Sequence, residues 1–210
     1  FESNFLLMFI KTYSSAVFGI SATTIQVEVN IDVGINFHLV GLPDVAVRES
    51  HQRIKAAFKN NKLHFPGKEV TINMSPADIR KEGSAYDLPL AAAVLAASKQ
   101  INSDKLSKYV LMGELSLDGT LQPIKGVLPI AINARKEGFE GFILPKQNVR
   151  EAAVVDKLKV YGAENISEVI GFLNGDDNLE QTIIDTRAEF AKLVTNNPLD
   201  FSDVKGQENV

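Results

Sequence analysis

A chain of 210 residues, 45% hydrophobic and 23% charged, has the length and composition of one globular core with an added tail. Its net charge of -4 means that any binding of nucleic acid depends on a local basic patch and not on the overall charge. The absence of cysteine excludes disulfides, cysteine nucleophiles and cysteine-ligated metal sites.

No targeting segment is predicted near the start of the chain, and we expect a cytoplasmic protein. The apolar stretch 5–10 is too short to span a bilayer, and no small-residue cleavage site follows it. Met8 is expected to be the native start, which makes residues 1–7 a remnant foreign to the natural chain. The three histidines lie too far apart in sequence for a local metal motif, so no metal site is predicted: His38, His51 and His64.

The first elements in chain order are predicted to be strands. Residues 22–30 are rich in β-branched side chains and alternate with a period of two. Residues 32–34 supply turn chemistry, and 37–42 form a second apolar run. We expect these two segments to pair as antiparallel strands, and 69–74 to form another strand.

Two helices follow from the next patterns. The first is predicted to open at Pro43, where a missing N–H costs nothing, and to end at Asn60–Asn61, with Val47, Ile54 and Phe58 on its apolar face. The second, 87–97, is apolar all round, which indicates a buried central helix with an acidic residue at its N-terminal end.

The remaining elements alternate between strand and helix. Strands are predicted at 109–117, 141–145 and 158–161, and helices at 126–136, 148–154 and 167–173. This order predicts an α+β fold of two layers with a mixed sheet. After residue 172 acidic residues outnumber basic ones and apolar residues thin out, so 173–199 is interpreted as an acidic helical linker.

Three long segments then point to a family. They are NFHLVGLPDVAVRESHQRIKAAF (36–58), NMSPADIRKEGSAYDLPLAAAVLAA (73–97) and LMGELSLDGTLQPIKGVLPIAINARKEGFEGFILPKQN (111–148). Residues 8–172 resemble the N-terminal, Lon-protease-like domain of the ComM/YifB family of AAA+ ATPases, also called magnesium-chelatase-related. The resemblance implies the fold of domain two of ribosomal protein S five, as in the Lon protease domain.

The end of the chain carries a second resemblance. The segment DFSDVKGQ (200–207) is similar to the lead-in of an AAA+ module, so 200–210 is interpreted as the start of a truncated one. The full-length protein is thereby implied to use ATP and magnesium, to form a hexameric homo-oligomer and to encircle DNA. The Gly67–Lys68 pair is followed by Glu69 and lacks the upstream glycine of a Walker A loop, so this chain is not expected to hydrolyse ATP by itself or to bind a cofactor.

A Lon-type protease needs a serine nucleophile and a lysine base. In the family pattern KDGPSAG the serine lies four residues after the lysine, which from Lys81 is Ala85. The base lies six residues after the isoleucine of the PI-x-G run, which from Ile124 is Ile130. Both halves of the dyad are therefore expected to be missing.

A one-residue shift leaves one alternative for catalysis. Ser84 would then be the nucleophile, with Lys81 or Lys125 as its base. Ser84 also suits the N-terminal cap of the buried helix, which explains this serine without catalysis.

A row of side chains on the first helix is the candidate DNA-binding surface. Its members follow at i, i+4, i+7 and i+11, which makes a single stripe away from the apolar face: Arg48, Gln52, Lys55 and Lys59. Such a row suits phosphate contact, and the alternative is an ordinary solvated face. With no aromatic platform in the neighbouring sequence, recognition of single strands by base stacking is less favoured.

Three functions are compatible with these patterns. The first is a non-catalytic module of an AAA+ motor, assisting ring assembly and DNA contact in recombination or branch migration. The second is a Ser84-based peptidase. The third, suggested by the family name, is a component of a magnesium-chelatase-type ATPase.

Overall fold

The structure, a computed structural model, describes residues 9–184. Three predicted segments lie wholly or partly outside these residues: the foreign remnant 1–7, the linker from residue 185 on, and the segment 200–210. The described chain forms a mixed seven-stranded sheet in the order β3-β4-β2-β1-β5-β8-β9. Its strands are β1 (Ile10–Phe18), β2 (Ser21–Asp32), β3 (Phe37–Val40), β4 (Glu69–Ser75), β5 (Tyr109–Leu111), β8 (Gly141–Pro145) and β9 (Lys159–Ala163).

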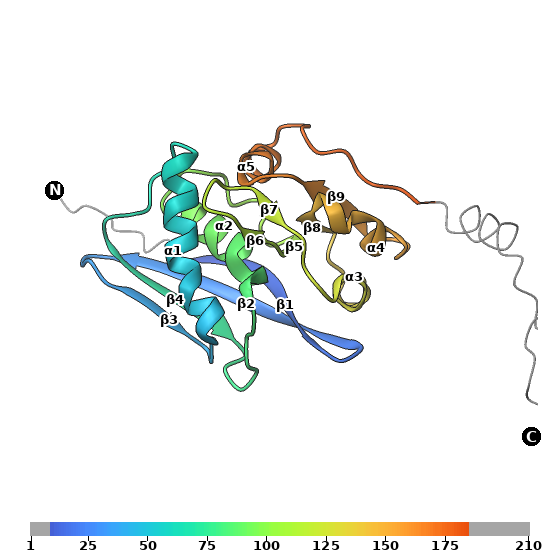
Figure 1. The fold of residues 1–210 in the computed structure, drawn as a ribbon, viewed down its shortest axis with the longest axis horizontal. Coiled ribbons are helices and arrows are strands. Elements are labelled where there is room, and N and C mark those ends of the chain that lie inside the picture. Colours follow the sequence, from blue (N-terminus) through green and yellow to red (C-terminus); the bar gives the residue numbers. More distant parts are fainter. Residues whose placement is uncertain (1–8, 185–210) are drawn as a thin grey trace, which may run out of the picture.

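A separate two-stranded sheet and the helices complete the fold (Figure 1). The small sheet is formed by β6 (Glu114–Leu115) and β7 (Leu121–Gln122). The α-helices are α1 (Val45–Asn60), α2 (Asp87–Ala97), α3 (Val127–Lys136), α4 (Val149–Ala153) and α5 (Ile166–Asn174). Two single 3₁₀ turns precede α2 and α4, namely η1 (Ser84–Tyr86) and η2 (Lys146–Asn148).

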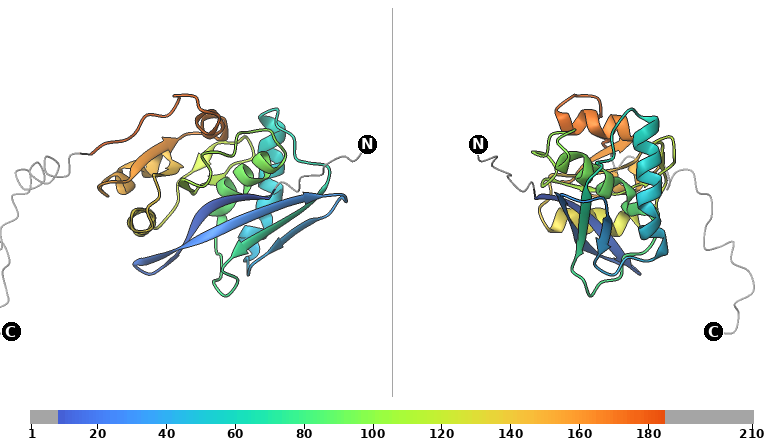
Figure 2. Two further views of the ribbon diagram at one scale, coloured as in Figure 1. Left: turned by 180° about the vertical axis from the view of Figure 1, so that it is seen from behind. Right: turned by 90° about the vertical axis from the view of Figure 1, so that its left-hand side faces the viewer.

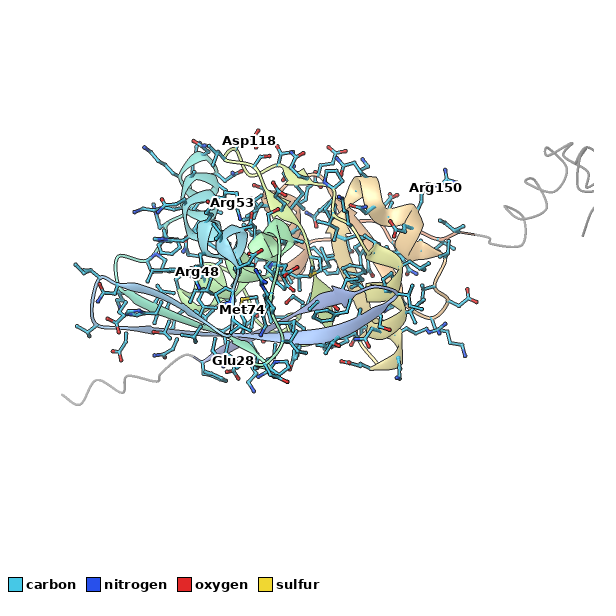
Figure 3. All side chains as sticks on the ribbon, turned by 60° about the horizontal axis from the view of Figure 1, so that its bottom comes forward. Glu28, Arg48, Arg53, Met74, Asp118 and Arg150 are labelled. Atoms are coloured by element: carbon cyan, nitrogen blue, oxygen red, sulfur yellow. The ribbon has the colours of Figure 1, made fainter. Side chains whose placement is uncertain are left out.

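The half of the sheet formed by β1 to β4 is covered on one face. In β2, Ile25, Val27 and Val29 are fully buried, and the residues between them are only half-buried. Helices α1 and α2 lie on that buried side (Figures 1 and 2). On the opposite side Glu28 accepts a hydrogen bond from Asn73 of β4 at 2.9 Å, which is typical of a solvated sheet face (Figure 3).

The predicted pairing of the second and third strands is wrong. Strand β4 lies between them: it pairs antiparallel with β2 over the whole register from Gln26 opposite Ser75 to Asp32 opposite Glu69. Strand β3 instead lies at the sheet edge and runs parallel to β4. The longer pairing places the alternating apolar residues of β4 on the core face beside those of β2, and local turn chemistry carries no information about this distant partner.

The other half of the sheet is packed on both faces. Tyr109, Leu111 and Ile143 belong to the same hydrophobic cluster as α2 and α5. The residues between them in β5 and β8 face a second cluster with α3 and α4, namely Val110, Phe142 and Leu144. All eleven residues of α2 are buried, so the prediction of a central apolar helix is confirmed.

Three predicted boundaries need correction. Pro43 precedes the helix cap and is not its first helical residue, because Asp44 is the N-cap of α1. The predicted strand 109–117 is interrupted after Leu111, and the N–H of Gly113 donates a hydrogen bond to the carbonyl of Ala85 in η1 at 2.8 Å. Ser84 lies in η1 and not at the cap of α2, whose N-cap is Tyr86.

The α+β class with a mixed sheet is confirmed. The β1–β2 and β2–β4 pairs run antiparallel, and the other four neighbouring pairs of the described sheet run parallel. Residues beyond α5 still contact the sheet: Leu179 is buried, and the N–H of Thr182 donates to the carbonyl of Val160 at 2.9 Å. The division at residue 172 stays a prediction. No helix within residues 9–184 has the length and apolar character needed to cross a membrane.

Candidate nucleic-acid interface

Both ends of α1 are fastened to other elements. At the start, one carboxylate oxygen of Asp44 accepts a hydrogen bond from the N–H of Val47 at 2.8 Å, and the other accepts one from Gly83 at 3.0 Å. At the end, the side-chain amides of Asn60 and Asn61 donate to the carbonyls of Leu117 and Asp118 at 2.7 and 2.8 Å. The bond from Val47 satisfies one of the N–H groups that a helix start leaves unpaired. The other three contacts tie α1 to neighbouring segments and fix its orientation on the core.

The buried face of α1 is the predicted one. Val47, Ile54 and Phe58 are almost completely excluded from solvent, and they pack in the cluster that contains α2 and β2. The same burial turns the predicted row outward: all four of its side chains are exposed, namely Arg48, Gln52, Lys55 and Lys59. Within residues 9–184 no ion pair joins the three cations of this row to a carboxylate. We call these four residues the basic row.

Arg53, on the same helix, has a different environment from Arg48 (Figure 3). Its guanidinium donates to both carboxylate oxygens of Asp87, at 2.7 and 2.9 Å, and to the carbonyl of Ala46. Asp87 has no exposed surface, and it also accepts from the N–H of Leu115 at 3.1 Å. Burial raises the pKa of the Asp87 carboxyl, against the opposing effect of these donors, while the hydrogen bond to Asp87 raises the pKa of Arg53.

The sequence does contain a signal for this pair, which the periodicity of α1 alone does not show. Asp87 opens a run that is otherwise wholly apolar, and a carboxylate inside such a helix needs a cationic partner. Arg53 lies three residues after the buried Ser50 and four before the buried Ala57, so helical spacing places it at the edge of the buried face. The pair joins α1 to α2 and has a structural role beneath the basic row.

Beside the C-terminal half of the basic row lies a pocket of about 360 Å³. Lys55 and Lys59 of the row contribute to it, together with four residues of the following loop: Lys62, Leu63, His64 and Phe65. The structure therefore places one aromatic side chain, the half-buried Phe65, near the row. The loop folds back along α1, which sequence spacing did not reveal.

Phe65 belongs to an aromatic group beneath this pocket. Its ring centroid lies 5.0 Å from that of His51 and 6.0 Å from that of Phe58. His51 in turn stacks on Phe37 with ring centroids 4.1 Å apart and planes inclined by 4°. Desolvation by burial lowers the pKa of His51, and the nearby charge of Lys55 lowers it further.

The lowered pKa of His51 gives a testable dependence of stability on pH. A base whose pKa is lower in the folded state stabilises the fold fully above its unfolded pKa of about 6.5, and that stability is lost as the pH falls from there through the lowered pKa of the folded state. His51→Phe keeps a ring on Phe37 but cannot be protonated. We expect its free energy of unfolding, measured in urea between pH 7 and 5, to fall less steeply than that of the wild type. Equal slopes would contradict the burial of this imidazole.

The two positions at which the family pattern would place a catalytic dyad lie in one apolar environment. Ile130 is buried in the cluster formed with α3, β8 and α4, and the half-buried Ala85 packs against the same cluster. The structure thus brings these positions together in one cluster, and neither side chain has an atom that takes or gives a proton.

The residues of the shifted dyad have other partners. The Ser84 hydroxyl donates to the carboxylate of Glu114, and the Lys81 ammonium donates to the carbonyl of Pro76. Lys81 has no exposed surface, and its burial lowers its pKa, an effect that Asp78 opposes. Lys125 is exposed and lies two residues before the start of α3. No hydrogen bond within residues 9–184 connects Ser84 to either lysine.

The Gly67–Lys68 pair does not lie in a phosphate-binding loop. A phosphate-binding loop follows a strand and opens a helix, so that backbone N–H groups surround the phosphates. Gly67 and Lys68 instead lead into the strand β4. Among residues 9–184 no group of three histidine or acidic side chains is placed to hold a metal ion.

Comparison with known proteins agrees with this architecture. Residues 27–148 match the family model described as subunit ChlI of Mg-chelatase. The competence protein ComM of Haemophilus influenzae is 36% identical over 198 residues, which cover 94% of this chain and 39% of that protein. The protein YifB of Escherichia coli is 39% identical over 197 residues, covering 93% and 38% respectively.

Similarity to Lon proteases is weaker. The Lon protease of Clostridium beijerinckii is 24% identical over 122 residues, which cover 56% of this chain and 15% of that protein. The chain spans 38–39% of the length of the ComM and YifB relatives named above.

The fold and the site together define an α+β domain that has an exposed basic helix, with the apolar side chains of Ala85 and Ile130 where the Lon-type pattern would place a dyad. The matched residues make up more than half of the chain, and the chain therefore belongs to the magnesium-chelatase-related ChlI family, with ComM and YifB among its relatives.

Proposed function

We propose that this chain is a non-catalytic N-terminal module of a ComM-like ATPase, which assists ring assembly and contacts DNA during recombination or branch migration. The family is AAA+ ATPase-like. ATP and magnesium would act in the part of the relatives that this chain does not span, and the complete protein would be a cytoplasmic hexamer. The chelatase alternative has only the family name in its favour.

The observation that carries the proposal is the basic row. Lys55 and Lys59 are exposed on a helix fixed at both ends, and they have no carboxylate partner within residues 9–184. An exposed ammonium without an ion pair is available to a phosphate without first breaking an internal contact. The chain carries a net charge of -4, so attraction of DNA has to come from such a local surface.

Joint replacement of Lys55 and Lys59 by alanine is expected to weaken duplex binding roughly tenfold, and to reduce the slope of log affinity against log salt by about two, because each lysine neutralises one phosphate. Fluorescence anisotropy with a labelled duplex at several salt concentrations measures both quantities.

The matched control is Lys125→Ala with Lys136→Ala, which removes the same charge from exposed positions around α3. This control should bind as the wild type does. A similar loss in both double variants would reduce the effect to net charge and overturn the assignment to α1.

A further inference from the structure

The loop that follows α1 is held in one conformation beside the basic row. Lys62 adopts a left-handed backbone with φ of 58°, which reverses the chain after the helix. The N–H of Leu63 then donates to the carbonyl of Phe58 at 2.8 Å. The side-chain amide of Gln100 holds the backbone of His64 on both sides, accepting from its N–H at 2.8 Å and donating to its carbonyl at 2.7 Å. The pocket walls are therefore positioned before any ligand arrives.

The pocket combines positive charge with apolar surface. Three lysine side chains line it, Lys55, Lys59 and Lys62, and no carboxylate does. Leu63 and Phe65 supply the apolar part, and both pack against the main hydrophobic cluster. A ligand that matches these walls carries negative charge next to a flat or apolar group.

The pocket is open to solvent and has room for one small group. Its volume of about 360 Å³ lies near the lower end of small-ligand pockets, which run from about 300 to 1,000 Å³. A DNA duplex presents phosphates to a surface while its bases remain stacked inside. A single strand can also insert a base, and stacking of a base on an aromatic side chain contributes about 1–3 kcal/mol.

We propose that this pocket accepts one unstacked nucleotide of a single strand whose backbone phosphates lie along the basic row. The inference rests on the proposed DNA contact and adds to it a preference for single-stranded segments. The base lies against Phe65 and Leu63, and its flanking phosphates contact the three lysines. Strand separation at a DNA junction would supply such a nucleotide.

The test compares three ligands on the 210-residue chain: a short oligothymidine, an abasic strand of the same length, and a duplex. The wild type should bind oligothymidine about tenfold more tightly than the abasic strand, because only the former offers bases to stack. Phe65→Leu keeps apolar bulk but removes the aromatic face. We expect this variant to lose the preference for oligothymidine while its duplex affinity stays within twofold of the wild type.

Phe37→Leu is the matched control. Phe37 contacts the same aromatic group, with its ring centroid 6.1 Å from that of Phe65, but it does not line the pocket. This variant should retain the preference for bases, and thermal unfolding of both variants measures any change in packing. Lys62→Gly removes one charge at a left-handed position that suits glycine, so it should weaken binding to both strands without lowering the melting temperature.

The possible outcomes separate the two proposals. An unchanged ratio of oligothymidine to abasic binding in Phe65→Leu, or an equal loss in Phe37→Leu, overturns the nucleotide pocket and leaves the duplex contact intact. Absence of binding to all three ligands overturns both. Tighter binding of an acidic peptide with an aromatic residue than of oligothymidine would assign the pocket to a protein partner and overturn the inference.

Discussion

Replacement of Arg53 by alanine is expected to lower the free energy of unfolding by about 3–5 kcal/mol at neutral pH. Asp87 has no exposed surface, and Arg53 donates to both of its carboxylate oxygens. Without the guanidinium, the carboxylate keeps only the N–H of Leu115 as a hydrogen-bond donor. Removing one partner leaves a buried charge uncompensated, and this costs more stability than the intact pair contributes. The loss therefore exceeds that expected for a surface ion pair.

The loss should depend on pH in a definite direction. Burial raises the pKa of Asp87, and the hydrogen bond from Arg53 is the largest effect that lowers it. Removal of Arg53 therefore raises the pKa of Asp87 further. An acid whose pKa is raised in the folded state costs no stability below its unfolded pKa of about 3.9, and stability is lost as the pH rises from there through the raised pKa of the folded state. The difference between Arg53→Ala and the wild type should therefore shrink between pH 7 and 4, as measured by urea unfolding at each pH.

Arg48→Ala is the control for this prediction. It removes the same charge from the same helix, but the Arg48 side chain is exposed and has no ion pair within residues 9–184. Its effect should stay within about 0.5 kcal/mol. If the two variants lost equal stability, the effect would come from the charge of α1 and not from the buried pair.

The contrast between these two arginines shows how far sequence patterns reach. Helical spacing correctly placed Arg48, Lys55 and Lys59 on the exposed side of α1, because the apolar residues alone determine which face is buried. The same spacing could not assign a partner to Arg53, since Asp87 lies 34 residues away and the contact is tertiary. Periodicity describes one element at a time.

The strand predictions show the same limit: a sequence pattern locates a single strand but not its distant partner. The segment Gly141–Pro145 was predicted with its observed bounds because all its residues are apolar and it lies between two helices. The predicted partner of β3 was wrong because β4, which is distant in sequence, pairs with both β2 and β3 and lies between them. The pocket was missed for a related reason: Leu63 and Phe65 reach α1 only through the reversal at Lys62 and the hydrogen bonds of Gln100.

Gly41→Ala should be among the most destabilising single substitutions in the link between β3 and α1, lowering the free energy of unfolding by about 2–6 kcal/mol. Two costs add. Gly41 has φ of +104°, which for a residue with a side chain costs about 1–3 kcal/mol. A Cβ atom at this position would also lie 2.0 Å from the backbone carbonyl oxygen of Met74, so β4 would have to move, at a further cost of about 1–3 kcal/mol.

Gly83→Ala separates the two costs. Gly83 has a similar φ of +84°, but a Cβ atom there would meet nothing within 4 Å. It should therefore show only the conformational cost, and the difference between the two variants measures the close approach of Gly41 to β4. Equal losses in chemical denaturation would contradict that approach. Because Gly41 connects β3 to the capped start of α1, a real difference also means that the sheet edge fixes the position of the helix that carries the basic row.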